Sequence, residues 1–451
     1  MNKNNVDMLS DPITKGLISM TMPIMIMNVV QMLFNVVDLT ALRFFADDNA
    51  VGAVGACGML STLCTSLLLG LSAGANVVVA KRIGEGNKER TDRATVTALL
   101  IAVFGGITLM IIGLIFAETF LKWTNCPESL LPGATKYFKI YFFGVPFTIF
   151  YNFCASILRA TGDTKRPMLF TNLAGLLKML FNILFLTLTD MTVQGVALAS
   201  ICAYIVSDIL VFVSVLHNKD VHVDFSEIKI DFAEFKEILF IGVPTGLQSA
   251  MYSFANTIIT TVVNGFGAAA TTGIAIANQF DGILYHISCA TSVAAIPYVA
   301  QNVGAKNYDR VKKIVVRAVL VTVGFGATFG AFSAIFSRQL SSIMSSSPEV
   351  IAFSVQKMII ISSTYFICGI NEVMGGVLKG MGKPIIPTVA TFVWMCLFRF
   401  VWVYVIYPFC PQSLTFLYLV WPIGWILSIA TLLVAYFPAI KKLQKNCLIT
   451  N

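Results

Sequence analysis

Residues 72–90 read "SAGANVVVAKRIGEGNKER", and residues 292–310 read "SVAAIPYVAQNVGAKNYDR". The two stretches align without a gap at a separation of 220 positions, so that Arg90 corresponds to Arg310. Similar residues at one fixed separation are the signature of an internal repeat. The chain is therefore predicted to consist of two related halves.

A second pair of related stretches supports the repeat. "LRATGDTKRPM" occupies residues 158–168, and "LKGMGKPIIP" occupies residues 378–387, again 220 positions later. Each stretch has a basic residue, a glycine three positions further on and a proline soon after, which are residue types typical of a tight turn between helices. We expect both stretches to be structural turns on the cytoplasmic side.

The composition places both halves in a membrane. Of the 451 residues, 57% are hydrophobic and 12% are charged, which is more apolar than a water-soluble protein of this length can bury. About twelve apolar stretches are long enough to cross roughly 30 Å of hydrocarbon as helices. The predicted spans are 14–42, 51–80, 94–118, 135–158, 167–188, 193–216, 237–264, 271–303, 314–338, 350–378, 385–408 and 414–438.

The spans and the repeat together define the expected fold. We expect an all-α polytopic membrane protein with two parallel six-helix repeats, or lobes, around a central cavity. The N-terminal lobe would cover residues 1–216, a charged cytoplasmic linker residues 217–236, and the C-terminal lobe residues 237–451. Parallel repeats of this kind are a construction of secondary transporters, which hold substrate between their halves.

The charge distribution predicts the orientation. Most of the 31 lysines and arginines fall on one side of the predicted spans, so both termini are expected in the cytoplasm of a plasma (inner) membrane protein. The first 16 residues are polar, and the first apolar run is therefore expected to be a retained span. Because the basic residues are spread over separate loops, nucleic acid is not an expected partner.

At four of these stretches the chain resembles a known family. They are "PIMIMNVVQMLFNVVD" (23–38), "ILRATGDTKRPM" (157–168), "YVAQNVGAKNYDR" (298–310) and "VLKGMGKPIIPT" (377–388). In order and spacing they are similar to the multidrug and toxic compound extrusion family. The resemblance implies a two-lobed, twelve-helix antiporter that exports amphipathic, often cationic, organic molecules while protons or sodium ions run inward. Membrane lipids and small organic substrates would be its partners, and an internally duplicated transporter can work as a monomer.

Ionisable residues inside the membrane are functional candidates because each is costly to bury. Asp38 lies roughly 22 Å beyond Pro23 along the first helix. It matches the family aspartate that takes up protons or takes part in ion binding. Asn182 matches the family's fifth-span asparagine, but Leu186 replaces the acid expected four residues later. A sodium ion held by Asp38 and Asn182 would lack that oxygen ligand, so a proton is the favoured coupling ion and sodium the alternative.

Four further charged residues complete the coupling candidates. Lys178 lies deep in the fifth span and could pair with Asp38 or Asp208. Asp281 and Glu372 lie within spans of the second half, and for Glu372 support of the turn at Lys379 is an equal alternative to coupling.

The substrate surface is predicted less sharply. Aromatic rings and nearby polar groups suit a cationic, amphipathic molecule. The candidates are Phe34, Tyr141, Tyr252, Gln279 and Arg399, and Arg399 would most simply neutralise one of the buried acids.

Other functional classes find little support. The sequence has no phosphate-binding Walker loop, no metal-ligand spacing among its three histidines and no nucleophile elbow, so neither an enzyme nor a cofactor is expected. A lipid or lipid-linked oligosaccharide flippase of the same superfamily remains the alternative. Such flippases commonly have about fourteen spans and several arginines in the cavity. A channel or receptor would not require paired halves.

Overall fold

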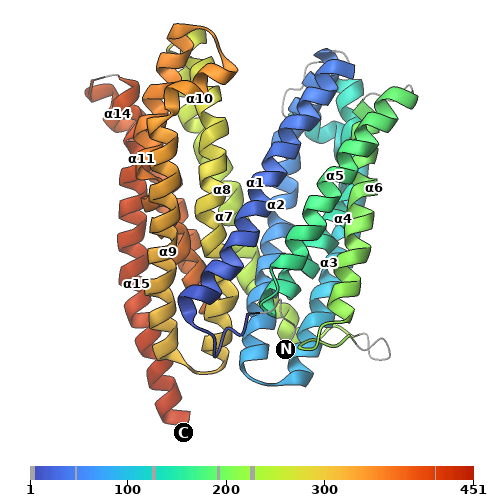
Figure 1. Cartoon of the computed structure of the whole chain (residues 1–451), viewed down its shortest axis with the longest axis vertical. Coiled ribbons are helices and arrows are strands. Elements are labelled where there is room, and N and C mark those ends of the chain that lie inside the picture. The colour runs from blue at the N-terminus through green and yellow to red at the C-terminus, as the bar shows by residue number, and fades with distance from the viewer. Residues whose placement is uncertain are drawn as a thin grey trace. The chain divides into compact units, whose positions relative to one another are not determined.

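The computed structural model describes residues 6–45, 48–123, 128, 130–189, 193–223, 229–411 and 413–450. Within these ranges the side chains of residues 35–45, 48–56, 58–60, 62–64, 186, 193, 253, 254, 257 and 446–450 are outside the description. The described chain is helical without β-strands (Figure 1). Its long elements correspond one to one with the predicted spans.

The chain divides into two compact units. Unit 1 comprises Met1–Val6 and Val29–Gly246, and unit 2 comprises Asp7–Asn28 and Leu247–Asn451. The division falls inside two helices, so α1 (Ile13–Phe45) begins in unit 2 and ends in unit 1, while α7 (Phe232–Asn264) begins in unit 1 and ends in unit 2. These units follow packing, and the sequence-based division at residues 216 and 237 stays a prediction.

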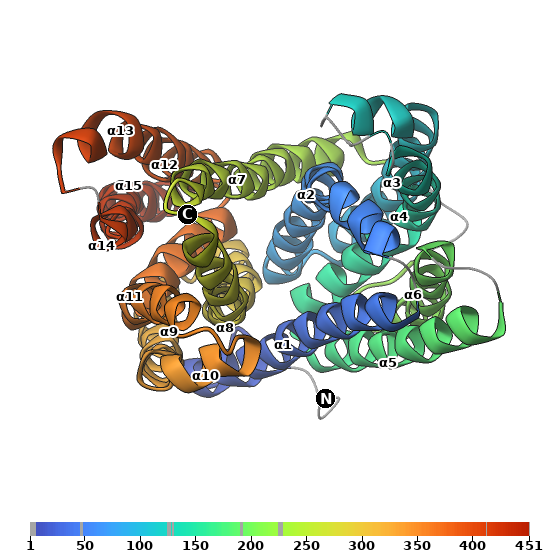
Figure 2. The same ribbon diagram turned by 90° about the horizontal axis from the view of Figure 1, so that it is seen from above.

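Five whole helices build unit 1. They are α2 (Asp48–Gly84), α3 (Lys88–Trp123), α4 (Leu131–Ala160), α5 (Lys165–Leu188) and α6 (Val193–Leu216). Helix α4 packs against α2, α3 and α6, and α5 packs against α6 (Figure 2). The buried face of α4 is therefore surrounded by protein, whereas α3 and α5 keep many apolar side chains exposed, as helices in contact with lipid do.

The remaining elements build unit 2. They are α8 (Ala268–Gly304), α9 (Tyr308–Ile335), α10 (Ser337–Met344), α11 (Pro348–Gly380), α12 (Ile385–Thr391), η1 (Phe392–Leu397), α13 (Phe398–Val401), η2 (Trp402–Ile406), η3 (Tyr407–Phe409), α14 (Leu414–Tyr418) and α15 (Val420–Thr450). Helix α11 is central and packs against α8, α9 and α15 (Figure 2). The segments α12 to η3 form one continuous span that contains two π-helical stretches, η1 and η2.

The two repeated turns have the predicted form. Gly162 between α4 and α5 and Gly382 between α11 and α12 both have positive φ, 86° and 72°. This conformation is accessible to glycine at little cost and allows the chain to reverse within a few residues. In the first turn Asp163 accepts the backbone N–H groups of Lys165 and Arg166 and so caps the start of α5.

Eleven helical stretches among the described residues are long and apolar enough to cross a membrane. The one predicted span without a counterpart among these eleven stretches is 237–264, which corresponds to α7. The prediction of an all-α polytopic membrane protein with two lobes is confirmed.

Candidate transport site

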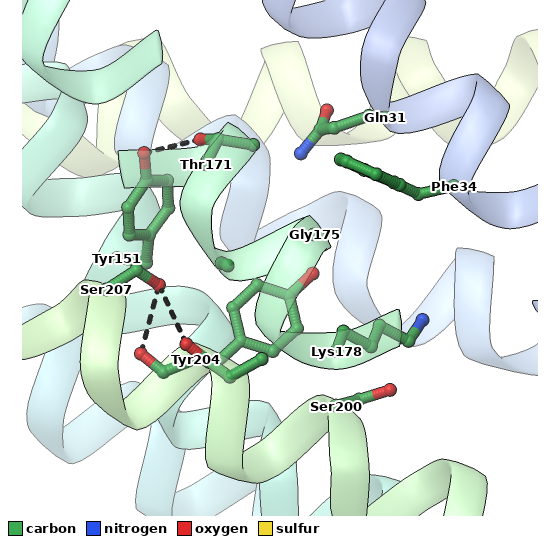
Figure 3. Close-up of a pocket in the computed structure, with 11 residues that line it drawn as sticks. Gln31, Phe34, Tyr151, Thr171, Gly175, Lys178, Ser200, Tyr204 and Ser207 are labelled. Atoms are coloured by element: carbon green, nitrogen blue, oxygen red, sulfur yellow. Dashed lines mark hydrogen bonds between the residues drawn. The ribbon is translucent and has the colours of Figure 1, made fainter. Parts of the chain in front are cut away.

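A polar cavity lies inside unit 1, within the membrane-spanning part of its helices (Figure 3). Its volume is about 210 Å³. Four helices line it: α1 with Gln31 and Phe34, α4 with Tyr151, α5 with Thr171, Ala174, Gly175 and Lys178, and α6 with Ser200, Ala203, Tyr204 and Ser207. A cavity with several polar groups inside an apolar bundle is the usual setting of a small-molecule site.

Helical periodicity brings the polar side chains of α6 to one face. Ser200, Tyr204 and Ser207 stand at positions i, i+4 and i+7, which lie above one another on an α-helix. Ser207 Oγ donates to the backbone carbonyls of Ala203 and Tyr204, at 3.3 and 3.1 Å. These bonds satisfy the buried hydroxyl within its own helix.

A buried hydrogen bond joins α4 to α5 at the cavity wall. Tyr151 Oη lies 2.5 Å from Thr171 Oγ1 and donates to the carbonyl oxygen of Pro167 at 2.6 Å. Tyr151 and Thr171 are each 6% exposed, and Figure 3 shows their polar ends pointing toward one another. The bond fixes the spacing of α4 and α5 on this side of the cavity.

An aromatic ring from α1 lies against α5. A Cβ atom built on Gly175 would lie 1.9 Å from Phe34 Cε2, so only glycine at this position lets the ring pack where it does. The close approach places Phe34 in the cavity wall beside Lys178 of the same helix as Gly175. Phe34 and Lys178, both predicted from sequence, therefore line one cavity.

The other first-lobe candidates have different positions. Asn182 is buried, at 2% exposure, one turn beyond Lys178 on α5. The side chains of Asp38 and Leu186 lie outside the described residues, so the pairing of Asp38 with Lys178 stays a prediction. Asp208 lies next to Ser207 on α6 but lines a separate groove.

In unit 2 the structure brings Glu372 and Tyr252 together. Tyr252 Oη donates to Glu372 Oε1 at 2.8 Å, and Asn371 Nδ2 donates to the same hydroxyl at 3.3 Å. The backbone carbonyl of Glu372 accepts the hydroxyl of Ser292 at 2.7 Å. This cluster, which we call the Glu372 cluster, joins α7, α8 and α11.

A second charged group in unit 2 has a partner that the sequence did not suggest. Lys357 Nζ lies 2.8 Å from Asp281 Oδ2 and also contacts Asn278 Oδ1. Lys357 is only 3% exposed on α11 and lies within a membrane-spanning stretch. Burial of a lysine is tolerable here because the carboxylate and amide oxygens compensate its charge.

In the described part of the chain, Arg399 does not pair with Asp281 or with Glu372. Its guanidinium donates to Asn256 Oδ1 at 2.7 Å and lies over the ring of Trp421, 5.3 Å from the ring centroid. Lys357 lies over the same ring at 5.6 Å. The prediction that Arg399 neutralises one of the buried acids was therefore wrong, because an amide and an aromatic ring stabilise the charge of Arg399 instead. The π-helical stretches η1 and η2 flank Arg399 and widen the helix on both sides of it.

Two predicted substrate residues lie away from the first-lobe cavity. Tyr141 belongs to an aromatic group on α4, with ring centroids 6.3 Å from Phe138 and 6.4 Å from Tyr137. Gln279 is exposed on α8. Both stay predictions as substrate contacts.

The sequence analysis missed Gln31, Tyr151, Thr171, Ser200, Tyr204 and Ser207 of the cavity. A signal was available for two of the helices. Thr171, Gly175, Lys178 and Asn182 form one stripe along α5 with a spacing of three or four residues, like the stripe on α6. Polar stripes in otherwise apolar spans indicate faces turned to protein or water. Among the described residues, no group of three or more His, Cys, Asp or Glu side chains could hold a metal ion.

Comparison with known proteins agrees with the repeat and with the fold. The family model for MatE matches residues 23–184 and 244–405, two segments of equal length, one in each half. The probable multidrug resistance protein NorM of Thermotoga maritima is 26% identical over 387 residues, which cover 84% of this chain and 83% of that protein. The probable multidrug resistance protein YoeA of Bacillus subtilis is 24% identical over 376 residues, which cover 81% of each chain.

A solved structure shares the fold over the whole chain. It is the outward-facing conformation of a multidrug resistance MATE family transporter of the MOP superfamily, with a TM-score of 0.92 and 19% identity, covering 99% of this chain and 100% of that one. The family model matches more than half of the present chain in two repeats. The chain therefore belongs to the MatE family, whose members are membrane transporters rather than enzymes.

Proposed function

We propose that this protein is a secondary active exporter. It expels amphipathic, cationic organic compounds by alternating access, in exchange for protons that move inward. It works as a monomer in the plasma (inner) membrane, with both termini in the cytoplasm and with lipid around its apolar faces. The observation that carries the proposal is the polar cavity inside the membrane-spanning first lobe, lined from α1, α4, α5 and α6.

The cavity chemistry suits an amphipathic molecule. Phe34 offers an aromatic face and Tyr204 a ring with a polar end, while Thr171 and Ser200 offer hydroxyl groups. Few fixed charges line it, so molecules of different shapes can be accommodated by apolar contact and a small number of hydrogen bonds.

Proton coupling is supported over sodium coupling by the ligand set of the first lobe. Leu186 stands where the family resemblance implies an acid, and the described residues that line the cavity include no carboxylate. A sodium ion at Asp38 and Asn182 would therefore have few hard oxygen ligands. A single carboxyl that gains and loses a proton as its surroundings change needs no such set.

The second lobe supplies another proton acceptor. Glu372 is held by the hydroxyl of Tyr252, an arrangement that suits both the ionised and the protonated carboxyl. Asp281, in contrast, is engaged in an ion pair with Lys357 of the same lobe. We therefore assign coupling to Asp38 and Glu372 and a structural role to Asp281.

The test is export from proteoliposomes. The purified protein is reconstituted with the fluorescent cation ethidium inside, and a proton gradient or a sodium gradient is imposed in separate runs. We expect proton-driven ethidium release at least about tenfold above protein-free vesicles, and release near that background for Asp38→Asn. Glu89→Gln is the matched control, because it removes an exposed cytoplasmic acid that only pairs with Arg93; its release should equal that of the wild type.

Two results would contradict the proposal. Release driven by sodium alone would refute proton coupling and direct attention to the amide and hydroxyl groups near Asn182. No ethidium movement under either gradient, with movement of a fluorescent lipid-linked sugar instead, would favour the flippase alternative.

A further inference from the structure

A second cavity in unit 1 forms a groove on the outside of the helix bundle. Its volume is about 320 Å³. Three helices line it: α3 with Val103 and Ile107, α4 with Pro146, Phe147 and Phe150, and α6 with Ile205, Asp208, Ile209 and Phe212. We call it the Asp208 groove. All but one of its lining residues are apolar.

The rim of the Asp208 groove is exposed. Val103 and Ile107 on α3 are 39% and 40% exposed, and Ile209 on α6 is 59% exposed. These residues lie within stretches apolar enough to span a membrane, where exposed side chains contact lipid. The groove therefore opens toward the hydrocarbon of the bilayer.

The exceptional lining residue is a carboxylate without a partner. Asp208 is 6% exposed, and among the described residues neither of its carboxylate oxygens has a hydrogen-bond partner. Asp208 lies eight residues before the end of α6 at Leu216, or roughly 12 Å into the helix. An unpaired carboxylate in apolar surroundings is costly, and a positive ligand would lower that cost.

Aromatic rings surround the same position. Phe150 of α4 and Phe212 of α6 have ring centroids 5.4 Å apart, and Phe147 completes the aromatic wall. An ammonium group is attracted both by a carboxylate and by the faces of such rings, whereas an alkyl or aryl tail packs against Val103, Ile107 and Ile205. The charge and the apolar walls of the Asp208 groove thus both suit an ammonium compound with an apolar tail.

We propose that the Asp208 groove binds lipophilic ammonium compounds that enter from the membrane, with the ammonium at Asp208 and the tail along α3 and α6. The inference rests on the proposed function and deepens it, since it gives cationic substrates an access site on the lipid side of the first lobe. Ser207, the neighbour of Asp208, lines the polar cavity. Consecutive residues of α6 thus line the membrane-facing groove and the interior cavity.

The test uses a photoreactive diazirine derivative of dodecylamine and the intact protein in lipid nanodiscs. We expect crosslinks, mapped by mass spectrometry, on peptides that contain Phe147, Phe150 or Ile209. Asp208→Asn keeps the side-chain size but removes the charge, and it should weaken dodecylamine binding at least about tenfold. The corresponding dodecanol derivative should bind the wild type and Asp208→Asn equally.

Two further variants keep the test decisive. Glu118→Gln removes an exposed acid from α3, which is one of the helices that line the groove. Glu118 itself is not a lining residue, so this change should leave dodecylamine binding unchanged. Ile209→Trp fills the groove while keeping Asp208, and it should reduce crosslinking even if Asp208→Asn does not fold. Amine binding unchanged in both Asp208→Asn and Ile209→Trp would overturn the proposal, as would crosslinks confined to other helices.

Failure of this inference is distinguishable from failure of the proposed function. Normal proton-driven ethidium export without crosslinks in the groove would refute the groove site alone. Charge-dependent crosslinking without export would uphold the groove site and refute the exporter.

Discussion

Gly86 and Lys306 hold equivalent positions in the two repeats, and both have a left-handed backbone. Their φ values are 70° and 57°, and Lys306 is the non-glycine residue with positive φ in the described part of the chain. Each precedes an asparagine, Asn87 or Asn307, whose side chain accepts the backbone N–H three residues later and caps the next helix. The turn geometry is thus kept in both repeats although the residue type differs.

The backbone at Lys306 leads to a prediction on stability. Because a left-handed conformation is unfavourable for residues with a Cβ atom, Lys306→Gly should raise the free energy of unfolding by about 0.5–1 kcal/mol. The opposite change, Gly86→Ala, should lower it by about 1 kcal/mol, since no atom lies within 4 Å of the added Cβ and only the backbone is affected. Equilibrium unfolding in mixed micelles measures both. A loss of stability in Lys306→Gly would contradict this account.

At the scale of elements, α2 and α7 approach so closely that their backbones touch. Gly70 and Gly74 on α2 face Gly242 and Gly246 on α7, and each pair has the four-residue spacing that puts both glycines on one helix face. A Cβ on Gly242 would lie 2.5 Å from Leu71 Cα, and one on Gly246 2.7 Å from Leu67 Cα. The contact therefore depends on the absence of side chains.

Substitution of these glycines should be costly. Gly246→Ala places a methyl group against rigid backbone, and overpacking of this kind costs about 2 kcal/mol of unfolding free energy. Gly324→Ala in α9 is the matched control, because nothing lies within 4 Å of its added Cβ. That change should instead raise stability by about 0.5–1 kcal/mol through helix propensity. Equal effects of the two changes in the same unfolding assay would refute the packing argument.

At the scale of the whole molecule, the repeated arginines give a structural reason why the same stretch occurs twice. In unit 1, Arg90 binds Glu234 at 2.8 Å, just inside the start of α7. In unit 2, the equivalent Arg310 donates to the backbone carbonyls of Met8 and Asp11, just before α1. Each arginine holds the start of a helix whose remainder belongs to the other unit.

A charged cluster strengthens this anchor in unit 1. Arg82 contacts Glu85, Glu234 and Glu237, and Arg82 and Glu234 are 3% and 1% exposed. In unit 2, Arg310 at the position equivalent to Arg90 donates to main-chain carbonyls. The start of α7 is therefore held by ion pairs, and the start of α1 by hydrogen bonds from a charged guanidinium to main-chain carbonyls.

Removal of Arg82 should release the start of α7. Arg82→Gln leaves Glu234 buried with Arg90 as its remaining cation, and breaking a buried ion pair costs about 3 kcal/mol. Hydrogen exchange followed by mass spectrometry should show faster exchange in residues 232–246. The exchange rate of residues 308–335 should be unchanged. Arg82→Lys keeps the charge and should give an intermediate effect. Lys122→Gln is the control, because it removes an exposed cation that pairs with Glu118 near the end of α3, and it should change little. Exchange unaltered by Arg82→Gln would show that glycine packing alone holds α7.

Much of the fold followed from the sequence because lipid imposes simple rules. Backbone groups in hydrocarbon must bond within a helix, so apolar length alone predicted the long elements from α1 to α15. The turn at Gly162 and its counterpart at Gly382 were recognisable because positive φ selects glycine. The candidate site was predictable only in part, through Phe34 and Lys178.

Side-chain partners depended on the tertiary structure. Nothing along the chain indicated a partner for Lys357, yet it lies against Asp281 of another helix. Charge counting could not choose between Lys357 and Arg399 as the partner of that acid, because sequence gives neither helix rotation nor distance. For the same reason the hydrogen bond between Tyr151 and Thr171 could not be predicted, because it forms only when α4 packs near α5.

The sequence by itself determined that this protein is a two-repeat helical membrane transporter, because hydropathy and repetition are local properties that can be read along the chain. Only the tertiary structure decided which polar residues share the first-lobe cavity, that Asp208 lines a separate apolar groove, and how α1 and α7 divide between the units. These are properties of helix rotation and packing, which arise from contacts between residues far apart in the chain.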